Sequence, residues 1–327
     1  MNLFLAILNN LNSNEKKKFF WIVFFIAILL ILELASLSVL LPIIKIIFSA
    51  EKLSYLNFDF FEKYTLNQQI YFLLAMLVLF FFLKNIFNAF LIYFKKRFLY
   101  DIQINFSSRV FSNYLNQSYD FFLKNNKPQI MRNLGILAEY IIVLENFINI
   151  AIEGLILMLI LSIIYYSNFY VGLTITIFSL IFVYVILKIF KDRFKKYGEL
   201  INFYNEKVLN NYLDSLGSIK DIILQKKQNF FVNDFSKNIS VQANVNVKNS
   251  FFVEVPKLLI EIVLVAGIAS LIVVLSLVNQ DFNDIIVILT FTVALILRAI
   301  PSVTRIIYQS SGLYFKVDTI KRVQNLI

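Results

Sequence analysis

The sequence predicts an all-α membrane protein with six long transmembrane helices, and three observations lead to this fold class. Hydrophobic residues make up 59% of the 327 residues and charged residues only 16%, whereas about a quarter of the residues in soluble domains are charged. Apolar runs that reach the roughly 20 residues needed to cross a bilayer recur along the chain. The segments between them keep a helical pattern and contain few Gly or Pro.

The predicted spans follow the apolar runs. They cover residues 19–48, 68–94, 134–166, 169–190, 258–279 and 284–307. Ahead of them, residues 1–15 repeat Leu, Phe and Ile at helical spacing, which predicts a short amphipathic elbow helix on the membrane surface. Residues 16–327 then form one six-span domain.

The distribution of Lys and Arg predicts that both ends of the chain lie in the cytoplasm. The connections "SNFY" (167–170) and "NQDFND" (279–284) contain neither residue, whereas residues 95–132 and 188–257 are rich in both. Cytoplasmic loops of membrane proteins carry this excess of positive charge. The net charge of +10 is therefore explained by the cytoplasmic loops of a multi-pass protein, and no nucleic-acid partner is expected. The expected location is a bacterial inner membrane.

The inner connections are much longer than the outer ones and lack turn residues. This predicts that spans 2 to 5 continue as helices well past the bilayer, with about 40 residues each, or about 60 Å at the helical rise of about 1.5 Å. The alternative is that residues 95–132 and 188–257 form ordinary structured loops, which would contain more turn residues.

Several kinds of chemistry are excluded by residues that the chain lacks. It contains no Cys and no His, which removes disulfides, thiolate or imidazole metal ligands, Cys nucleophiles and His bases. No GxxxxGK[ST] phosphate loop occurs and the seven glycines are scattered singly. We therefore expect no catalytic residue, no metal site and no ATP hydrolysis by this chain alone, and a membrane-embedded enzyme or a channel is disfavoured.

Charges inside the predicted spans are the candidate substrate-path residues, because a charge in hydrocarbon is costly and usually functional. Two interpretations stay open: these side chains neutralise one another, or several of them line a polar translocation path. The candidates are Arg298, Arg305, Glu33, Lys84 and Glu261, and Glu145 and Glu153 are further intramembrane carboxylates.

Arg298 and Arg305 share one face of span 6, because seven residues separate them. Counted from Asp284 at the outer surface, the helical rise places Arg298 about 21 Å inward and Arg305 about 31 Å inward. In a hydrocarbon core about 30 Å thick, Arg305 reaches the inner interface, where it can extend toward water. Arg298 lies deeper and is the better candidate for gripping a phosphate or pyrophosphate group.

Two stretches, taken with the six spans, tight outer turns and long inner excursions, resemble the membrane domain of ABC exporters (type IV fold). They are "YLNQSYDFFLKNNKPQIMRNL" (114–134) and "LDSLGSIKDIILQKKQNFF" (213–231). The resemblance implies a short coupling helix at each turn that docks into an ATP-binding domain. It assigns the first coupling surface to Tyr119, Asp120, Phe121, Phe122 and Lys124, and the second to Gly217, Ser218, Lys220 and Asp221.

The same resemblance implies partners and cofactors. ATP and Mg²⁺ would be bound by an ABC ATPase domain or subunit, and two membrane domains would form a homodimer or heterodimer, with helices swapped between the copies. Because the sequence stops after "VDTIKRVQNLI", the ATPase is expected on a separate polypeptide or beyond the end of this piece.

Three features are similar to flippases of lipid-linked oligosaccharides within that family. They are Glu33 followed by Pro42, "VPKLLIE" (255–261) and "LRAIPSVTRI" (297–306). They imply that the cargo is an anionic lipid-linked glycan or a similar amphiphile. A peptide, a drug or another lipid remains the alternative cargo.

Overall fold

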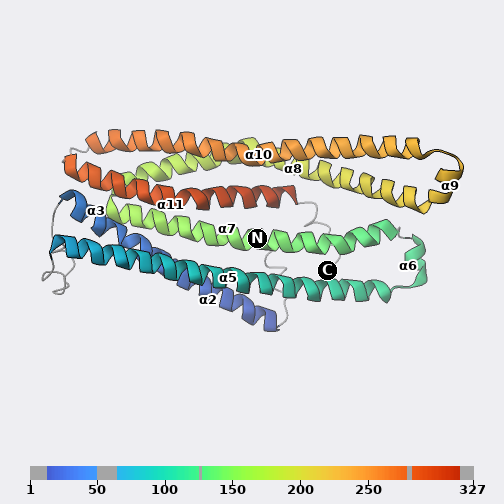
Figure 1. Cartoon of the computed structure of the whole chain (residues 1–327), viewed down its shortest axis with the longest axis horizontal. Helices are drawn as coiled ribbons and strands as arrows, with labels where there is room; N and C mark the ends of the chain where they lie inside the picture. Colours follow the sequence, from blue (N-terminus) through green and yellow to red (C-terminus); the bar gives the residue numbers. More distant parts are fainter. Residues whose placement is uncertain (1–12, 50–64, 125–126, 278–281, 317–327) are drawn as a thin grey trace. The chain divides into compact units, whose positions relative to one another are not determined.

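The computed structural model describes residues 13–49, 65–124, 127–277 and 282–316, and these residues are helical apart from short turns (Figure 1). Six of the helices are long and apolar enough to cross a membrane. The predicted all-α class is therefore confirmed, and the arrangement is consistent with a multi-pass membrane protein. The elbow helix predicted at 1–15 falls almost entirely outside the described residues, as do half of the outer connection 279–284 and the segment after Lys316.

The helices follow the predicted order. They are α2 (Ser13–Ser38), α3 (Leu40–Ser49), α5 (Leu66–Leu115), α6 (Tyr119–Lys124), α7 (Lys127–Ser167), α8 (Phe169–Gly217), α9 (Ile219–Leu224), α10 (Gln228–Leu277) and α11 (Phe282–Phe315).

The helices that contain spans 2 to 5 are far longer than a bilayer requires. Helices α5, α7, α8 and α10 have 50, 41, 49 and 50 residues, against the roughly 20 that cross the hydrocarbon. The prediction that these spans continue as helices is confirmed. The alternative of ordinary structured loops is wrong for the described residues.

The first span differs from its prediction, because it consists of two helices rather than one. Helix α2 ends at Ser38, Val39 follows, and α3 begins at Leu40. Pro42 gives the physical reason: its nitrogen carries no hydrogen and cannot donate to the carbonyl of Ser38. The first turn of a new helix needs no such donor. Beyond the break, Ile43 and Ile46 pack with Leu73 of α5 in a buried apolar cluster.

The chain divides into two compact units, and the division falls within the long helices. Unit 1 comprises Met1–Phe98, Ile150–Val183 and Ile260–Ile306. Unit 2 comprises Leu99–Asn149, Tyr184–Leu259 and Ile307–Ile327. Unit 1 therefore holds most of the apolar stretches, and unit 2 holds the two long inner excursions.

Unit 2 contains a long antiparallel pair of helices, α8 and α10, joined by α9. Tyr197 of α8 stacks on Phe252 of α10 with ring centroids 5.6 Å apart. Farther along α8, Asn211 Nδ2 donates to Asp234 Oδ2 at 2.5 Å, and Asn238 Nδ2 donates to Asn211 Oδ1 at 2.9 Å. Later residues of α8 contact earlier residues of α10, so the two helices are antiparallel. These contacts define how the two helices are aligned along their length as far as the turn at α9.

The short helices α6 and α9 lie where the long helices of unit 2 turn back (Figure 1). Helix α6 joins α5 to α7, and Phe106 of α5 contacts Tyr140 of α7 with ring centroids 6.5 Å apart. Each hairpin of unit 2 therefore ends in a six-residue helix.

In unit 1 the connection between α7 and α8 is a single residue, Asn168, which caps α8. Its Oδ1 accepts hydrogen bonds from the backbone amides of Tyr170 and Val171 at 3.0 and 3.2 Å. The hydroxyls of Tyr165 and Thr176 are 2.9 Å apart across this turn. A Cβ at Gly172 would lie 2.6 Å from Cδ1 of Tyr165, so the turn closes only because residue 172 has no side chain.

We predict that Gly172→Ala lowers the stability of the detergent-solubilised protein. The added methyl would push the ring of Tyr165 away from Thr176, and such overpacking costs about 1–3 kcal/mol. The matched control is Gly154→Ala, because a Cβ there would meet none of the described atoms within 4 Å. A thermal unfolding midpoint that falls for Gly172→Ala but not for Gly154→Ala supports this reading, and equal midpoints contradict it.

Candidate functional site

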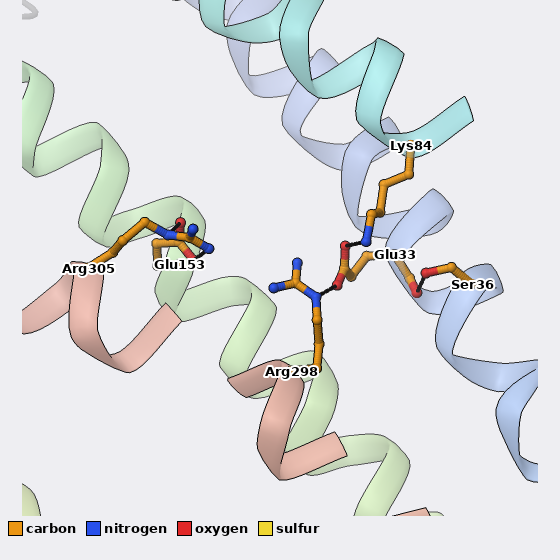
Figure 2. A network of polar contacts seen from close by, with 6 residues as sticks. All are labelled: Glu33, Ser36, Lys84, Glu153, Arg298 and Arg305. Atoms are coloured by element: carbon orange, nitrogen blue, oxygen red, sulfur yellow. Dashed lines mark hydrogen bonds and ion pairs between the residues drawn. The ribbon is translucent and has the colours of Figure 1, made fainter. Parts of the chain in front are cut away.

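Glu33 of α2 is bound by two cations that come from two other helices (Figure 2). Arg298 of α11 donates its Nε–H to Glu33 Oε1 at 2.6 Å. Lys84 Nζ of α5 lies 3.2 Å from Glu33 Oε2. The three residues belong to unit 1, and the Glu33 side chain is only 1% exposed. One buried carboxylate thus links α2, α5 and α11.

Glu33 and Lys84 each also make a contact within their own helix. Ser36 donates its hydroxyl to the backbone carbonyl of Glu33 at 2.8 Å, one helical turn along α2. The Lys84 ammonium also lies over the ring of Phe81, 4.1 Å from its centroid, which is a favourable cation–π arrangement. The three charged groups sum to one excess positive charge, because two cations share a single carboxylate.

Arg305 forms a second ion pair, with Glu153 of α7 (Figure 2). Arg305 Nε lies 2.5 Å from Glu153 Oε1, and Nη2 donates to Oε2 at 3.2 Å. This two-point geometry uses both oxygens of the carboxylate. The Arg305 side chain is 47% exposed, and its pairing with Glu153 was not predicted.

The two arginines differ in the part of the guanidinium that remains available. Arg305 engages Glu153 through Nε and Nη2 together. Arg298 engages Glu33 through Nε alone, and its two Nη nitrogens point away from Glu33 (Figure 2). No other residue in the described part of the chain pairs with Arg298. Its Nη groups are therefore open donors on a side chain that is 23% exposed.

The buried face of α11 changes from apolar to polar along its length. Phe291 and Leu295 are fully buried, and residues at the same helical spacing farther along are Arg298, Ser302 and Arg305. Ser302 has no exposed surface, and among the described residues its hydroxyl has no hydrogen-bond partner. Sequence reasoning missed Ser302, although its spacing from the two arginines was visible.

Glu261 does not join this cluster. It lies in α10 with an exposed side chain, and no residue in the described ranges pairs with it. Ion pairs of the kind that the first interpretation expects are thus present between Glu33, Lys84 and Arg298, and none involves Glu261 among the described residues. The role of these side chains in a translocation path stays a prediction.

The residues assigned to coupling lie on and around the two short helices. Tyr119, Asp120, Phe121, Phe122 and Lys124 make up most of α6; the side chain of Lys124 is outside the described part. Gly217 ends α8, Ser218 precedes α9, and Lys220 and Asp221 lie in the first turn of α9. The last four residues are all exposed.

Large apolar side chains are also exposed on the same two helices. Tyr119 is 77% exposed and Leu123 67% on α6, and Leu224 is 69% exposed on α9. Ile219 and Ile223 add to the α9 surface. We call these five residues the tip residues. Sequence reasoning missed four of them, because it followed charged, aromatic and small residues and overlooked aliphatic ones.

Neither a family match nor a metal site adds to this description. No family model matches the chain. Within the described ranges, no group of Asp and Glu side chains is placed to hold a metal ion.

We predict that Glu33→Gln strongly destabilises the protein, because it leaves two cations without their counter-charge. Removing one partner from a buried charge pair costs about 3–5 kcal/mol. Glu153→Gln is the matched control, because it leaves only one cation unpaired, and that cation, Arg305, is 47% exposed. Thermal unfolding in detergent should therefore show a much larger loss for Glu33→Gln, and equal losses would contradict the central role of Glu33.

Proposed function

We propose that this chain is the membrane-spanning subunit or domain of an ATP-driven exporter of the ABC type. It moves an anionic lipid-linked glycan, or a similar anionic amphiphile, across the bacterial inner membrane. The observation that carries the proposal is the pair of long hairpins: helices of 41 to 50 residues, about twice the roughly 20 that cross the hydrocarbon, are joined in pairs by six-residue helices. Long helices joined in this way suit the transmission of movement into a membrane domain.

The tip residues support a protein partner at the ends of these hairpins. Exposed patches of apolar side chains mark interaction sites, and each of the two short helices exposes several such side chains beside Asp120, Lys220 or Asp221. In this proposal an ABC ATPase binds ATP and Mg²⁺ and contacts α6 and α9. A second membrane domain, identical or related, completes the translocation path, because a single set of six spans encloses too little space for a lipid head group.

Arg298 supports an anionic cargo. A guanidinium whose Nη groups are open can bind two oxygens of a phosphate or pyrophosphate, and the Glu33 cluster leaves one positive charge uncompensated. Arg305 is less suited to this role, because Glu153 already binds its Nε and Nη2 groups. A neutral drug or an uncharged lipid would gain nothing from this arrangement.

We predict that the purified chain hydrolyses no ATP until an ABC ATPase subunit or domain is supplied. Replacing an exposed apolar tip residue by Glu should then prevent assembly without unfolding the protein. Leu123→Glu and Leu224→Glu should each abolish both co-purification with the ATPase and the reconstituted activity. The control is Val247→Glu, which changes an equally exposed residue of α10 (67% exposed) away from the tips.

Two results would contradict this part of the proposal. One is ATP turnover by the chain alone at a rate typical of transporters. The other is normal assembly of both tip variants with the ATPase, which would remove α6 and α9 from the interface.

We further predict that Arg298→Lys reduces stimulation of the ATPase by lipid-linked oligosaccharide, whereas Arg305→Lys does not. Both changes keep the positive charge and remove the planar fork, so the comparison isolates the geometry. For Arg298→Lys the lipid concentration that gives half-maximal stimulation should rise about tenfold, as expected for a two-point hydrogen bond between charged groups. Equal behaviour of the two variants would exclude Arg298 as the site of anion recognition.

A further inference from the structure

We propose that Lys84 keeps Arg298 available for the cargo: Lys84 is the permanent counter-ion of Glu33, and a phosphate or diphosphate ester binds the open edge of Arg298. This inference rests on the proposed anionic cargo and adds a positioning residue to it. The physical reason is that a carboxylate already neutralised by Lys84 cannot occupy both donor edges of the Arg298 guanidinium.

Burial ranks the two cations. The side chain of Lys84 is 6% exposed and that of Arg298 is 23% exposed. A buried ammonium that lost its carboxylate would have no water to replace it, so the Lys84–Glu33 pair persists. Arg298 is less buried and keeps its Nη groups unpaired among the described residues, so it can exchange or add a partner at lower cost.

Arg305, on the same helix as Arg298, binds a carboxylate that no other described cation shares. Its Nε and Nη2 contact both oxygens of Glu153. Arg298 reaches only Oε1 of Glu33, because Lys84 is bound to Oε2. The end-on contact of Arg298, and hence its open Nη edge, follows from the presence of Lys84 (Figure 2).

The charge count leads to the same conclusion. With Lys84 present, the cluster carries one excess positive charge and attracts an anion. Without Lys84, Glu33 and Arg298 form a neutral, closed pair. Ser302, whose fully buried hydroxyl lacks a partner among the described residues, shares this face of α11 and provides a further donor near the arginine.

The test measures anion binding to the full-length chain in nanodiscs of uncharged net composition (phosphatidylcholine), by calorimetry. The probe is farnesyl diphosphate, and farnesol and inorganic pyrophosphate are the comparison ligands. The wild-type protein should bind farnesyl diphosphate and not farnesol. Lys84→Met should weaken this binding at least about tenfold, although Arg298 is unchanged, because one uncompensated charge is lost from a partly buried site.

The double variant Lys84→Met/Glu33→Gln provides the rescue. It removes the ammonium and the carboxylate together, restores one excess positive charge, and leaves Arg298 without a charged partner. Its Kd should return to within about threefold of the wild type. The control is Arg305→Met/Glu153→Gln, which removes the other pair with no change in net charge and should leave the Kd unchanged.

The possible outcomes separate the inference from the proposed function. Unchanged binding by Lys84→Met, or a folded double variant that still binds weakly, would overturn the role of Lys84 while leaving an anionic cargo. No binding of farnesyl diphosphate by the wild type would instead reject the proposed cargo itself. If inorganic pyrophosphate binds as tightly as farnesyl diphosphate and follows the same variants, Lys84 keeps its role and the lipid origin of the ligand is overturned.

Discussion

A charged side chain in the hydrocarbon of a bilayer costs about 3 kcal/mol even by the lower scales, and this cost shapes unit 1 around Glu33. The carboxylate is almost fully buried, so it requires a cation, and the structure supplies two from different helices. Because α2, α5 and α11 each contribute one member, the three helices are held in one relative rotation. Apolar packing alone specifies such rotations weakly in a membrane, since lipid tails are as apolar as the side chains.

The fold was largely predictable, because the length of the apolar runs and the scarcity of Gly and Pro between them both indicate long helices. The long inner excursions show this well: few Gly or Pro interrupt residues 95–132 and 188–257, and the structure continues α5, α7, α8 and α10 through them. The break at Val39 was missed, since Pro42 inside an apolar run permits either a kink or a new helix. Two facts together favour a new helix: Pro42 cannot donate a hydrogen bond to the carbonyl of Ser38, and the residues after it pack against α5.

The site was predictable in its members and not in its pairing. Position along a span follows from counting residues, but rotation about the helix axis does not follow from the sequence. Glu33 and Glu261 therefore looked alike, although the first is buried between two cations and the second is exposed on α10. The Glu33–Arg298 contact joins residues 265 positions apart, and no local pattern encodes such a contact.

The ion pairs that involve Glu33 and Glu153 differ in the cost of breaking them. Separating Arg305 from Glu153 would leave Glu153, which is buried, without its cation. Withdrawing Arg298 leaves Glu33 still neutralised by Lys84. Separating α2 from α5 would create the opposite problem, because Lys84 and Glu33 are both buried and Lys84 would lose its carboxylate. Within unit 1, the charges therefore hold α2 to α5 and α11 to α7, and of these three contacts the one between Arg298 and Glu33 is lost at the lowest electrostatic cost.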